Sequence, residues 1–382
     1  QADLHKPPFE GYMTEIGMVR EELRFCQRHL ARWMRPQRVK TPIAQFAATS
    51  FRIAEPYGLA LILAPWNYPF QLCLSPLVGA IAAGNCVVLK PSAYAPHTSR
   101  VLAALLGEIF DPAYVAVVEG GRAENGALLA ERFDYIFFTG SVAVGKVVLA
   151  AAAQNLTPVT LELGGKSPSI VTKSADLRLA ARRLAFGKCL NAGQTCVAPD
   201  YLLIDEAVKE PFLALLEEEI AKFYPQGYAD MPSIINAKHF ARLTQLLTGV
   251  RIRFGGQTDA ERRWIAPTVV DEIAPGHPLM QEEIFGPILP VLSFQRLEEA
   301  VAFIQDRPKP LALYLFSNDQ DEHACVLRDC SFGGGCINDT IIHLATTHMP
   351  FGGVGESGMG AYHGQASFDT FSHYKSMVKK AN

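Results

Sequence analysis

The sequence predicts an α/β protein with a parallel β-sheet domain of the Rossmann-like kind, a second α/β domain and a small arm, and three observations support this fold class. Short apolar segments of strand length alternate with helical segments between residues 59 and 163, which is the pattern of βαβ units. The same alternation begins again after Gly164 and Gly165. A chain of 382 residues also exceeds what one hydrophobic core usually supports, so we expect two domains.

The predicted elements begin with a helix over residues 9–35, where apolar and charged residues recur at helical spacing until Pro36. A polar and β-branched stretch at about 40–53 then predicts an exposed hairpin with a role in assembly. The first alternation has strands at 59–63, 86–89, 114–118, 135–138 and 159–163, and helices at 72–83, 98–110, 125–132 and 144–154.

The second alternation predicts strands at 169–171, 201–205, around 269, 288–292 and 311–316, with helices at 177–190, 211–223, 237–247, 297–305 and 321–329. A strand-like arm over 368–378 follows a glycine-rich stretch. We therefore divide the chain into a first domain at 1–161, a second at 162–348, and a returning C-terminal segment with an oligomerisation arm at 349–382.

Composition narrows the class of protein. Apolar residues make up 49% and charged residues 19%, and the net charge of -3 gives no sign of a nucleic-acid partner. None of the eight cysteines forms a CxxC pair, so we expect reduced thiols in the cytoplasm and no metal site. No apolar run reaches the roughly 18–20 residues of a membrane span, and we expect none in this chain.

Cys196 is the first candidate for chemistry. It follows small and polar residues at the junction between a predicted helix and the strand at 201–205, and nucleophiles are commonly exposed at such junctions. A thiol reacts with a carbonyl when its thiolate is favoured and the resulting oxyanion is stabilised. The alternative is a buried structural cysteine.

Two strand ends are candidates for binding a nucleotide. Gly140, Ser141 and Gly145 lie between a strand and an alanine-rich helix, where free backbone N–H groups can face a pyrophosphate; an ordinary βα turn is the alternative. Lys90 ends another strand, at the edge where open α/β sheets bind ligands, although a surface lysine is the default interpretation of this position.

Further polar residues are candidates at the same edge. The amide of Asn67, after Trp66 in a proline-bracketed turn, can donate to an oxyanion or simply form the turn. Glu162 lies in an apolar strand, where burial raises a carboxyl pKa and suits a general base, unless a structural partner satisfies it. Glu283 and Phe285 can hold a ribose and a flat ring, or end a helix.

Two partial matches to nucleotide-binding motifs are rejected. Residues 353–358 fit GxGxxG, but they do not lie between a strand and a helix, so we predict a loop. Residues 165–167 end like a phosphate-binding loop, yet Thr160 stands where such a loop needs glycine.

Together these segments resemble the aldehyde dehydrogenase superfamily, in the same order and with the same 34 positions between Glu162 and Cys196. The carrying motifs are PWNYP at 65–69, LKPS at 89–92, FTGS at 138–141, LELGGK at 161–166, GQTC at 193–196, EIFGP at 283–287 and PFGG at 350–353. Residues 194–201 and 358–364 resemble the class 3 or fatty-aldehyde branch.

The resemblance implies oxidation of aldehydes to acids with NAD or NADP. It assigns Cys196 as nucleophile, Asn67 as oxyanion donor and Glu162 as the base that activates water. It implies a homodimer, an NAD(P)-binding domain at 1–161 and a catalytic domain at 162–348. The implied cofactor residues are Trp66, Lys90, Ser92, Gly140, Ser141, Gly145, Leu163, Glu283 and Phe285.

The chain departs from the family pattern at a few points. Ala93 replaces the glutamate that usually follows the ribose-binding lysine by three positions, so we expect NADP to be accepted as well as NAD. The chain is shorter than usual at its front, and it lacks the membrane tail of some fatty-aldehyde relatives.

Three alternative functions remain at this stage. They are a cysteine-dependent esterase or hydrolase, a dehydrogenase that passes its acyl group to coenzyme A, and a non-catalytic relative. Tyr68, Phe70, Thr195 and residues 341–343 can line an apolar approach to the thiol. We therefore expect medium- to long-chain aliphatic or aromatic aldehydes.

Overall fold

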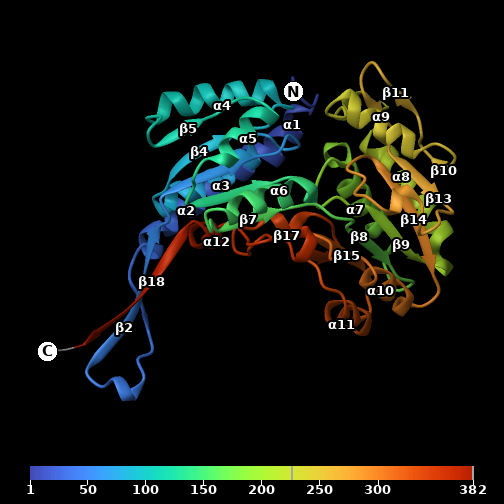
Figure 1. Ribbon diagram of the computed structural model, residues 1–382. Coiled ribbons are helices and arrows are strands. Elements are labelled where there is room, and N and C mark those ends of the chain that lie inside the picture. Colours follow the sequence, from blue (N-terminus) through green and yellow to red (C-terminus); the bar gives the residue numbers. More distant parts are fainter. Residues whose placement is uncertain (225–226, 381–382) are drawn as a thin grey trace.

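Two large β-sheets lie side by side, and a slender arm projects from the first of them (Figure 1). The computed structural model describes residues 1–224 and 227–380, so the last two residues of the predicted C-terminal segment, Ala381 and Asn382, lie outside the described residues. Within the described residues, no helix is both long enough and apolar enough to cross a membrane.

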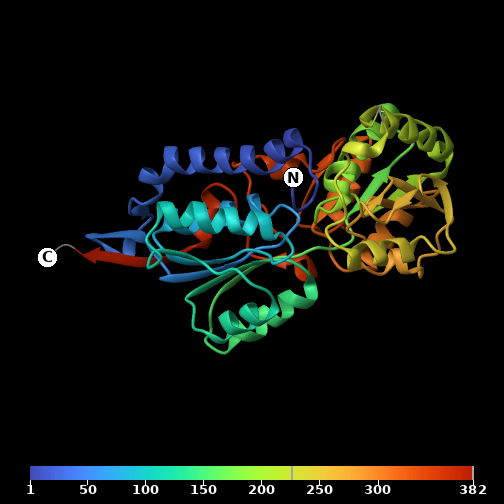
Figure 2. The ribbon, with the colours of Figure 1, turned by 90° about the horizontal axis from the view of Figure 1, so that it is seen from above.

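The first sheet has six strands in the order β17-β7-β6-β3-β4-β5, and only β17 is antiparallel to its neighbour. Helix α4 covers one face and helices α5 and α6 cover the other (Figure 2). The strands are β3 (Leu59–Leu63), β4 (Cys86–Lys90), β5 (Val115–Val117), β6 (Tyr135–Thr139), β7 (Val159–Glu162) and β17 (Gly358–Met359). The helices are α3 (Gln71–Ala83), α4 (Pro96–Ile109), α5 (Arg122–Ala130) and α6 (Val142–Ala153).

The alternation of side chains along β3 shows why this sheet is covered on both faces. Ala60 and Ile62 pack into the cluster that holds α3 and α4, whereas Leu61 and Leu63 pack toward α5 and α6. Side chains of successive strand residues point to opposite faces. A continuous apolar run is therefore what a strand buried on both sides requires.

The second sheet has seven strands in the order β10-β13-β14-β9-β8-β15-β16, and only β10 is antiparallel. Its strands are β8 (Pro168–Val171), β9 (Tyr201–Asp205), β10 (Arg251–Phe254), β13 (Thr268–Asp271), β14 (Ile288–Phe294), β15 (Ala312–Phe316) and β16 (Gly334–Ile337). Its helices are α7 (Leu177–Cys189), α8 (Lys209–Phe223), α9 (Ala237–Leu246), α10 (Leu297–Gln305) and α11 (Gln320–Asp329), and β11 (Thr258–Asp259) pairs with β12 (Trp264–Ile265) nearby.

The arm is an antiparallel sheet of β1 (Gln37–Val39), β2 (Ala48–Pro56) and β18 (Ser372–Lys380). The predicted hairpin at 40–53 therefore falls on β2 and the turn before it. The prediction of a strand over 368–378 is wrong at its start, because Gln365–Thr370 form helix α12, which buries Phe368 in the core of the first sheet.

The N-terminal residues form one helical element with an internal irregularity. Helix α1 (Pro8–Gly11) continues through a π-helical turn at Tyr12–Ile16 into α2 (Gly17–Trp33). The hydrophobic residues Val19, Phe25 and Trp33 of α2 pack into the core of the first sheet. This attachment places the residues before α2 near the junction of the two sheets (Figure 1).

Candidate active site

A cleft of about 880 Å³ lies at the carboxyl ends of the strands of the first sheet and extends to the loop before β9. Carboxyl ends of parallel strands are where open α/β sheets bind ligands. Nine of the twelve predicted site residues line it, namely Trp66, Asn67, Gly140, Ser141, Glu162, Leu163, Cys196, Glu283 and Phe285. Segments far apart in sequence therefore converge on one cavity.

The loop that carries Cys196 has an unusual backbone. After α7 ends, Asn191, Ala192 and Gly193 have φ values of 52°, 53° and 70°, all left-handed. Such conformations cost roughly 1–3 kcal/mol for a residue with a side chain, so surrounding contacts must maintain them. A Cβ on Gly193 would lie 2.3 Å from the carbonyl oxygen of Gly286. Only glycine is therefore compatible with this position.

Hydrogen bonds fix this loop against the loop after β3. The side chain of Gln194 donates to the carbonyls of Asn191 and Ser233, both at 3.1 Å. The Asn67 amide donates to the Gln194 carbonyl at 3.1 Å, and the hydroxyls of Tyr68 and Thr195 are 2.6 Å apart. These bonds hold the loop of Asn67, the predicted oxyanion donor, against the loop of Cys196, the predicted nucleophile.

The Cys196 thiol lies in the cleft and is protonated at neutral pH. Burial, together with the neighbouring Glu283 and Glu162, raises its pKa to about 12 against the opposing effect of backbone N–H groups. The side chain is only partly buried and lines the cleft. This position in the cleft differs from that of a structural cysteine sealed in the core. Because the thiol has a raised pKa, its reaction requires an acceptor for the thiol proton.

Glu162 ends β7 with its side chain directed into the cleft region, and it is 3% exposed. Neither carboxylate oxygen has a hydrogen-bond partner among the described residues. Burial raises the pKa of this carboxyl well above its usual range. Burying an acid without a partner lowers the stability of the fold, so its presence in the cleft indicates a role in chemistry. A raised carboxyl pKa suits proton transfer near neutrality.

Glu283 lies across the cleft from the first sheet, packed so closely on Gly164 that a Cβ there would be 1.9 Å from a carboxylate oxygen. Burial raises the pKa of Glu283 to about 8, and Asp200 adds to this effect while the Gly165 N–H opposes it. Phe285 has a φ of 52°, and its ring centroid is 5.3 Å from that of Trp66 in an edge-to-face arrangement. These two rings form an aromatic wall.

The N-terminus of α6 borders the cleft, and its first-turn N–H groups have no partners within the helix. Ser141 caps this helix by accepting from the Val144 N–H at 3.4 Å. A Cβ on Gly140 would lie 2.5 Å from the Phe138 ring, and one on Gly145 would lie 2.7 Å from Leu163. Gly140 thus leaves room for the Phe138 ring of β6, and Gly145 lets α6 pack on Leu163 at the end of β7. A helix N-terminus approached so closely is of the kind that binds phosphates.

Three predicted cofactor residues lie outside the lining of the cleft. The Lys90 ammonium donates to the carbonyls of Pro91 at 2.8 Å and Gly120 at 2.6 Å, and its residue is 3% exposed. The Ser92 hydroxyl accepts from the Tyr94 N–H at 3.2 Å. Gly145 is buried inside α6. The roles of these residues stay predictions.

Sequence reasoning missed several basic and imidazole side chains of the cleft, which are Lys166, Lys238, His239, Arg242, Arg307 and Lys309. Lys166 has a local signal, because it follows the glycine pair at 164–165 and ends the LELGGK motif. It pairs with Asp200 and donates to the carbonyls of Leu279 and Glu282. No local pattern marks the others.

The residues predicted for the approach of substrate are not part of this lining. Tyr68 is buried, and its hydroxyl is bonded to Thr195. Ile341 instead belongs to the hydrophobic cluster on which Cys196 packs. Buried apolar side chains therefore pack behind the thiol.

Comparison with known proteins agrees with this arrangement. A sequence profile described as the aldehyde dehydrogenase family matches residues 3–377. The 4,4'-diaponeurosporen-aldehyde dehydrogenase of Staphylococcus aureus is 50% identical over 384 residues, covering 99% of this chain and 84% of that protein. Human aldehyde dehydrogenase family 3 member B1 is 50% identical over 382 residues, covering 99% and 82%.

Solved structures show the same similarity in three dimensions. A substrate-bound structure of Staphylococcus aureus AldH has a TM-score of 0.98 at 50% identity, covering 100% of this chain and 84% of that one. The Mycobacterium tuberculosis aldehyde dehydrogenase complexed with NAD+ has a TM-score of 0.87 at 27% identity, covering 97% and 78%. This chain therefore belongs to the aldehyde dehydrogenase family and is an NAD(P)-dependent enzyme that oxidises aldehydes to carboxylic acids.

Proposed function

We propose that this enzyme oxidises its aldehyde through a covalent intermediate on Cys196. One observation carries the proposal: a partly exposed thiol, a side-chain amide and a buried carboxyl that has no partner within residues 1–224 and 227–380 line the same cleft. Acyl transfer through a thioester needs these three groups as nucleophile, oxyanion donor and general base.

The first step is addition of the Cys196 thiolate to the aldehyde carbonyl carbon. The thiol gives up its proton to solvent water in the cleft, a C–S bond forms, and the π electron pair of the C=O bond moves to oxygen. The Asn67 amide and the Cys196 backbone N–H stabilise this oxyanion. The product is a thiohemiacetal, held close to the aromatic wall of the cleft.

The residues around the cleft are suited to a dinucleotide. We propose that Glu283 holds the nicotinamide ribose, that Phe285, Trp66 and Leu163 contact the ring, and that Gly140, Ser141 and Gly145 form the pyrophosphate cradle. Lys90 and Ser92 would hold the adenosine ribose. When bound, NAD(P) supplies the acceptor for the hydride that leaves the thiohemiacetal carbon, and the C=O bond re-forms as a thioester on Cys196.

Glu162 completes the reaction as a general base. It takes a proton from water, the hydroxide adds to the thioester carbon, and the Cys196 sulfur leaves as the carboxylic acid forms. A carboxyl already paired within the protein would be a weaker base. The absence of a partner for Glu162 among the described residues therefore favours hydrolysis over transfer of the acyl group to coenzyme A.

We further propose medium- to long-chain aliphatic or aromatic aldehydes as substrates, because the chain resembles the class 3 or fatty-aldehyde branch and Cys196 lies against apolar side chains. The exposed arm, with Ile43 95% and Phe46 85% exposed, supports a homodimer. Eight free cysteines suit the reducing cytoplasm. We retain residues 1–161 as the NAD(P)-binding domain, 162–348 as the catalytic domain, and 349–382 as the returning segment and arm.

The test is formation of NADH or NADPH on addition of aldehyde. We expect the wild-type chain to show it and Cys196→Ala to lose it completely, with Cys189→Ala as the matched control because that thiol is sealed in the core. An aldehyde series of increasing length measures the substrate class. Retention of activity in Cys196→Ala would refute the mechanism, and preference for short charged semialdehydes would refute the substrate class.

A further inference from the structure

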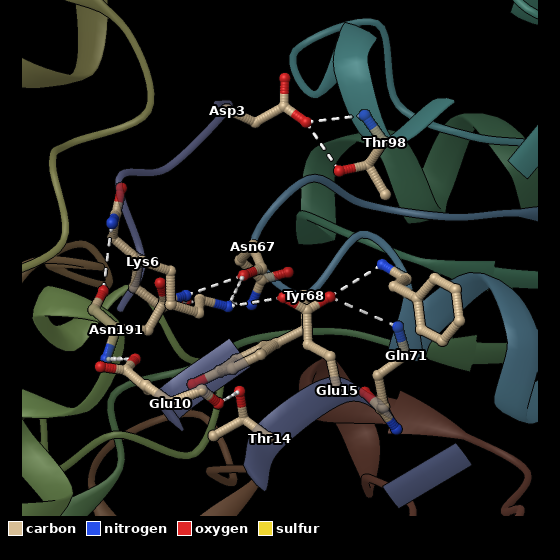
Figure 3. Close-up of polar contacts among 12 residues, drawn as sticks. Asp3, Lys6, Glu10, Thr14, Glu15, Asn67, Tyr68, Gln71, Thr98 and Asn191 are labelled. Atoms are coloured by element: carbon tan, nitrogen blue, oxygen red, sulfur yellow. Dashed lines mark hydrogen bonds and ion pairs between the residues drawn. The ribbon is translucent and has the colours of Figure 1, made fainter. Parts of the chain in front are cut away.

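The residues before α2 bridge the two halves of the molecule. Asp3 accepts from the backbone N–H of Thr98 at 2.8 Å and from its hydroxyl at 2.7 Å, at the start of α4 beside the first sheet (Figure 3). The Leu4 carbonyl accepts from the Ser233 N–H at 2.9 Å, in the loop before α9 beside the second sheet. The segment from Asp3 to Glu15 therefore lies across the junction at which the cleft forms.

A buried lysine of this segment reaches the loop that carries Asn67. The Lys6 side chain is 3% exposed, and its ammonium donates to the Glu15 carboxylate at 2.9 Å. The same ammonium donates to the Asn67 backbone carbonyl at 3.3 Å and lies 4.2 Å from the centroid of the Tyr68 ring. One charge thus contacts two consecutive residues of the loop (Figure 3).

Glu15 fixes the far end of the same loop. Its second carboxylate oxygen accepts from the Phe70 N–H at 2.8 Å, where α3 begins. With Lys6 on the Asn67 carbonyl and Glu15 on the Phe70 amide, the ion pair holds the loop at both ends. The loop has little freedom to move without breaking a buried, charge-assisted hydrogen bond.

Glu10 holds the loop of the thiol in the same way. Its carboxylate accepts from the Asn191 N–H at 2.8 Å, at the first of the three left-handed residues before Cys196. The Asn191 side chain in turn donates to the Asn67 carbonyl at 2.8 Å. The Asn67 carbonyl is therefore a junction that receives one donor from the N-terminal segment and one from the thiol loop (Figure 3).

We propose that Lys6, Glu10 and Glu15 are positioning residues that set the distance between the Asn67 amide and Cys196. The inference rests on the proposed function of those two residues and adds a set of charges outside the cleft lining. Each side chain contacts one backbone group. Lys6 donates to the Asn67 carbonyl, Glu15 accepts from the Phe70 N–H, and Glu10 accepts from the Asn191 N–H. Contacts of this kind fix where a loop lies, and a misplacement of about 1 Å can cost about 100-fold in rate.

The experiment uses the full chain with NAD and a saturating aldehyde. Lys6→Met removes the ammonium at similar size, and Lys6→Met with Glu15→Gln removes both charges so that no unpaired charge is buried. Glu10→Gln keeps an acceptor for the Asn191 N–H but removes the charge. Glu21→Gln is the matched control, because Glu21 pairs only with Arg28 on the surface of α2 and its side chain is 52% exposed.

We expect kcat to fall about 10- to 100-fold in Lys6→Met and in the double variant, with a smaller fall in Glu10→Gln and none in Glu21→Gln. The KM for NAD should stay within about twofold, since these residues do not line the cleft. Unchanged kcat in the folded double variant would overturn the proposal.

A second measurement separates positioning from general weakening of the fold. If Lys6 acts through Asn67, adding Lys6→Met to an Asn67→Ala background should cost less than about twofold, because the positioned amide is already absent. An equal loss in both backgrounds would overturn the proposal. Failure of the proposed function itself would look different, since Cys196→Ala would then retain activity.

Discussion

Two buried glutamates of this enzyme have opposite environments. Glu15, 9% exposed, gives one carboxylate oxygen to the Lys6 ammonium and the other to the Phe70 N–H. Glu162, 3% exposed, has no partner for either oxygen among the described residues. The first lies behind the loop of Asn67 and the second lines the cleft. Although both side chains are buried, Glu15 therefore holds the loop of Asn67 in position and Glu162 is left free for proton transfer.

The contrast shows how to separate the two roles of a buried acid. A carboxylate that accepts several hydrogen bonds is stabilised in its charged form and contributes to folding. A carboxyl that is merely desolvated keeps a raised pKa, as Glu162 does, and remains able to exchange a proton with a substrate or water. The following predictions test this distinction by changing each residue in turn.

The largest expected effect is on turnover in Glu162→Gln. Because the amide cannot accept a proton, we expect steady-state kcat to fall by about 10²- to 10⁴-fold. Its free energy of unfolding should change by less than about 1 kcal/mol, since no hydrogen bond to the carboxylate is lost. Steady-state kinetics and urea denaturation measure both quantities. Near-normal turnover in this variant would contradict the assignment of Glu162 as the catalytic base.

A different pattern is expected for Glu15→Gln, where the free energy of unfolding should fall together with turnover. The change leaves the Lys6 ammonium buried without its counter-charge, which typically costs about 3–5 kcal/mol of unfolding free energy. Denaturant titration measures the loss, and Glu21→Gln again provides the comparison at an exposed ion pair. A change below about 1 kcal/mol would mean that the buried pair does not stabilise the fold.

The pH dependence of turnover tests the same contrast with a smaller effect. Both Glu162 and Cys196 have pKa values raised by burial and must be deprotonated to act. Lowering the pH should therefore reduce kcat, by up to about tenfold per unit, with the loss beginning above the ordinary carboxyl range. Glu162→Gln should remove the contribution of that carboxyl to the profile. A flat profile down to the ordinary range of glutamate would contradict the raised pKa.

Adding a carboxylate where the chain lacks one should have the smallest effect. Ala93 is exposed beside Lys90 and Ser92, the proposed adenosine ribose site. In Ala93→Glu, repulsion of a 2′-phosphate should lower kcat/KM for NADP by roughly tenfold while leaving NAD nearly unchanged. Measuring both cofactors with wild type and variant checks this. An equal change for NAD and NADP would place the subsite elsewhere.

The sequence predicted the cleft residues because each has a local signal. Glu162 interrupts an apolar strand, Cys196 lies at a helix-to-strand junction, and Gly140 lies between a strand and a helix. Their approximate convergence follows from the rule that parallel strands share one binding edge. The resemblance to a known family supplied their roles, which spacing alone left open.

The positioning charges carry no such signal. Lys6 is 61 positions from Asn67 in the chain, and Glu10 is 181 positions from Asn191. In the sequence Lys6 is an ordinary charge before the predicted helix and Glu10 is one in its first turn, and only folding brings them against the two loops. Long-range contacts between a side chain and a backbone group leave no periodic pattern for sequence reasoning to detect.

Some strands of the fold could likewise be predicted from local sequence, whereas others depend on tertiary contacts. Strands β3 and β9 have the predicted bounds because their apolar runs are buried on both faces. Strand β16 was missed because Gly334–Ile337 begins with glycines that have no strand preference of their own. It is defined by its pairing with β15, a tertiary contact.

The most direct test of the mechanism is to trap its intermediate. Glu162→Gln should still transfer hydride once and then stall, because the thioester forms but water is not activated. Mixing this variant with aldehyde and NAD, followed by mass spectrometry of its peptides, should show the acyl group on the peptide that contains Cys196, with about one NADH formed per chain. An unmodified Cys196 after NADH has formed, or an acyl group on another residue, would contradict the mechanism.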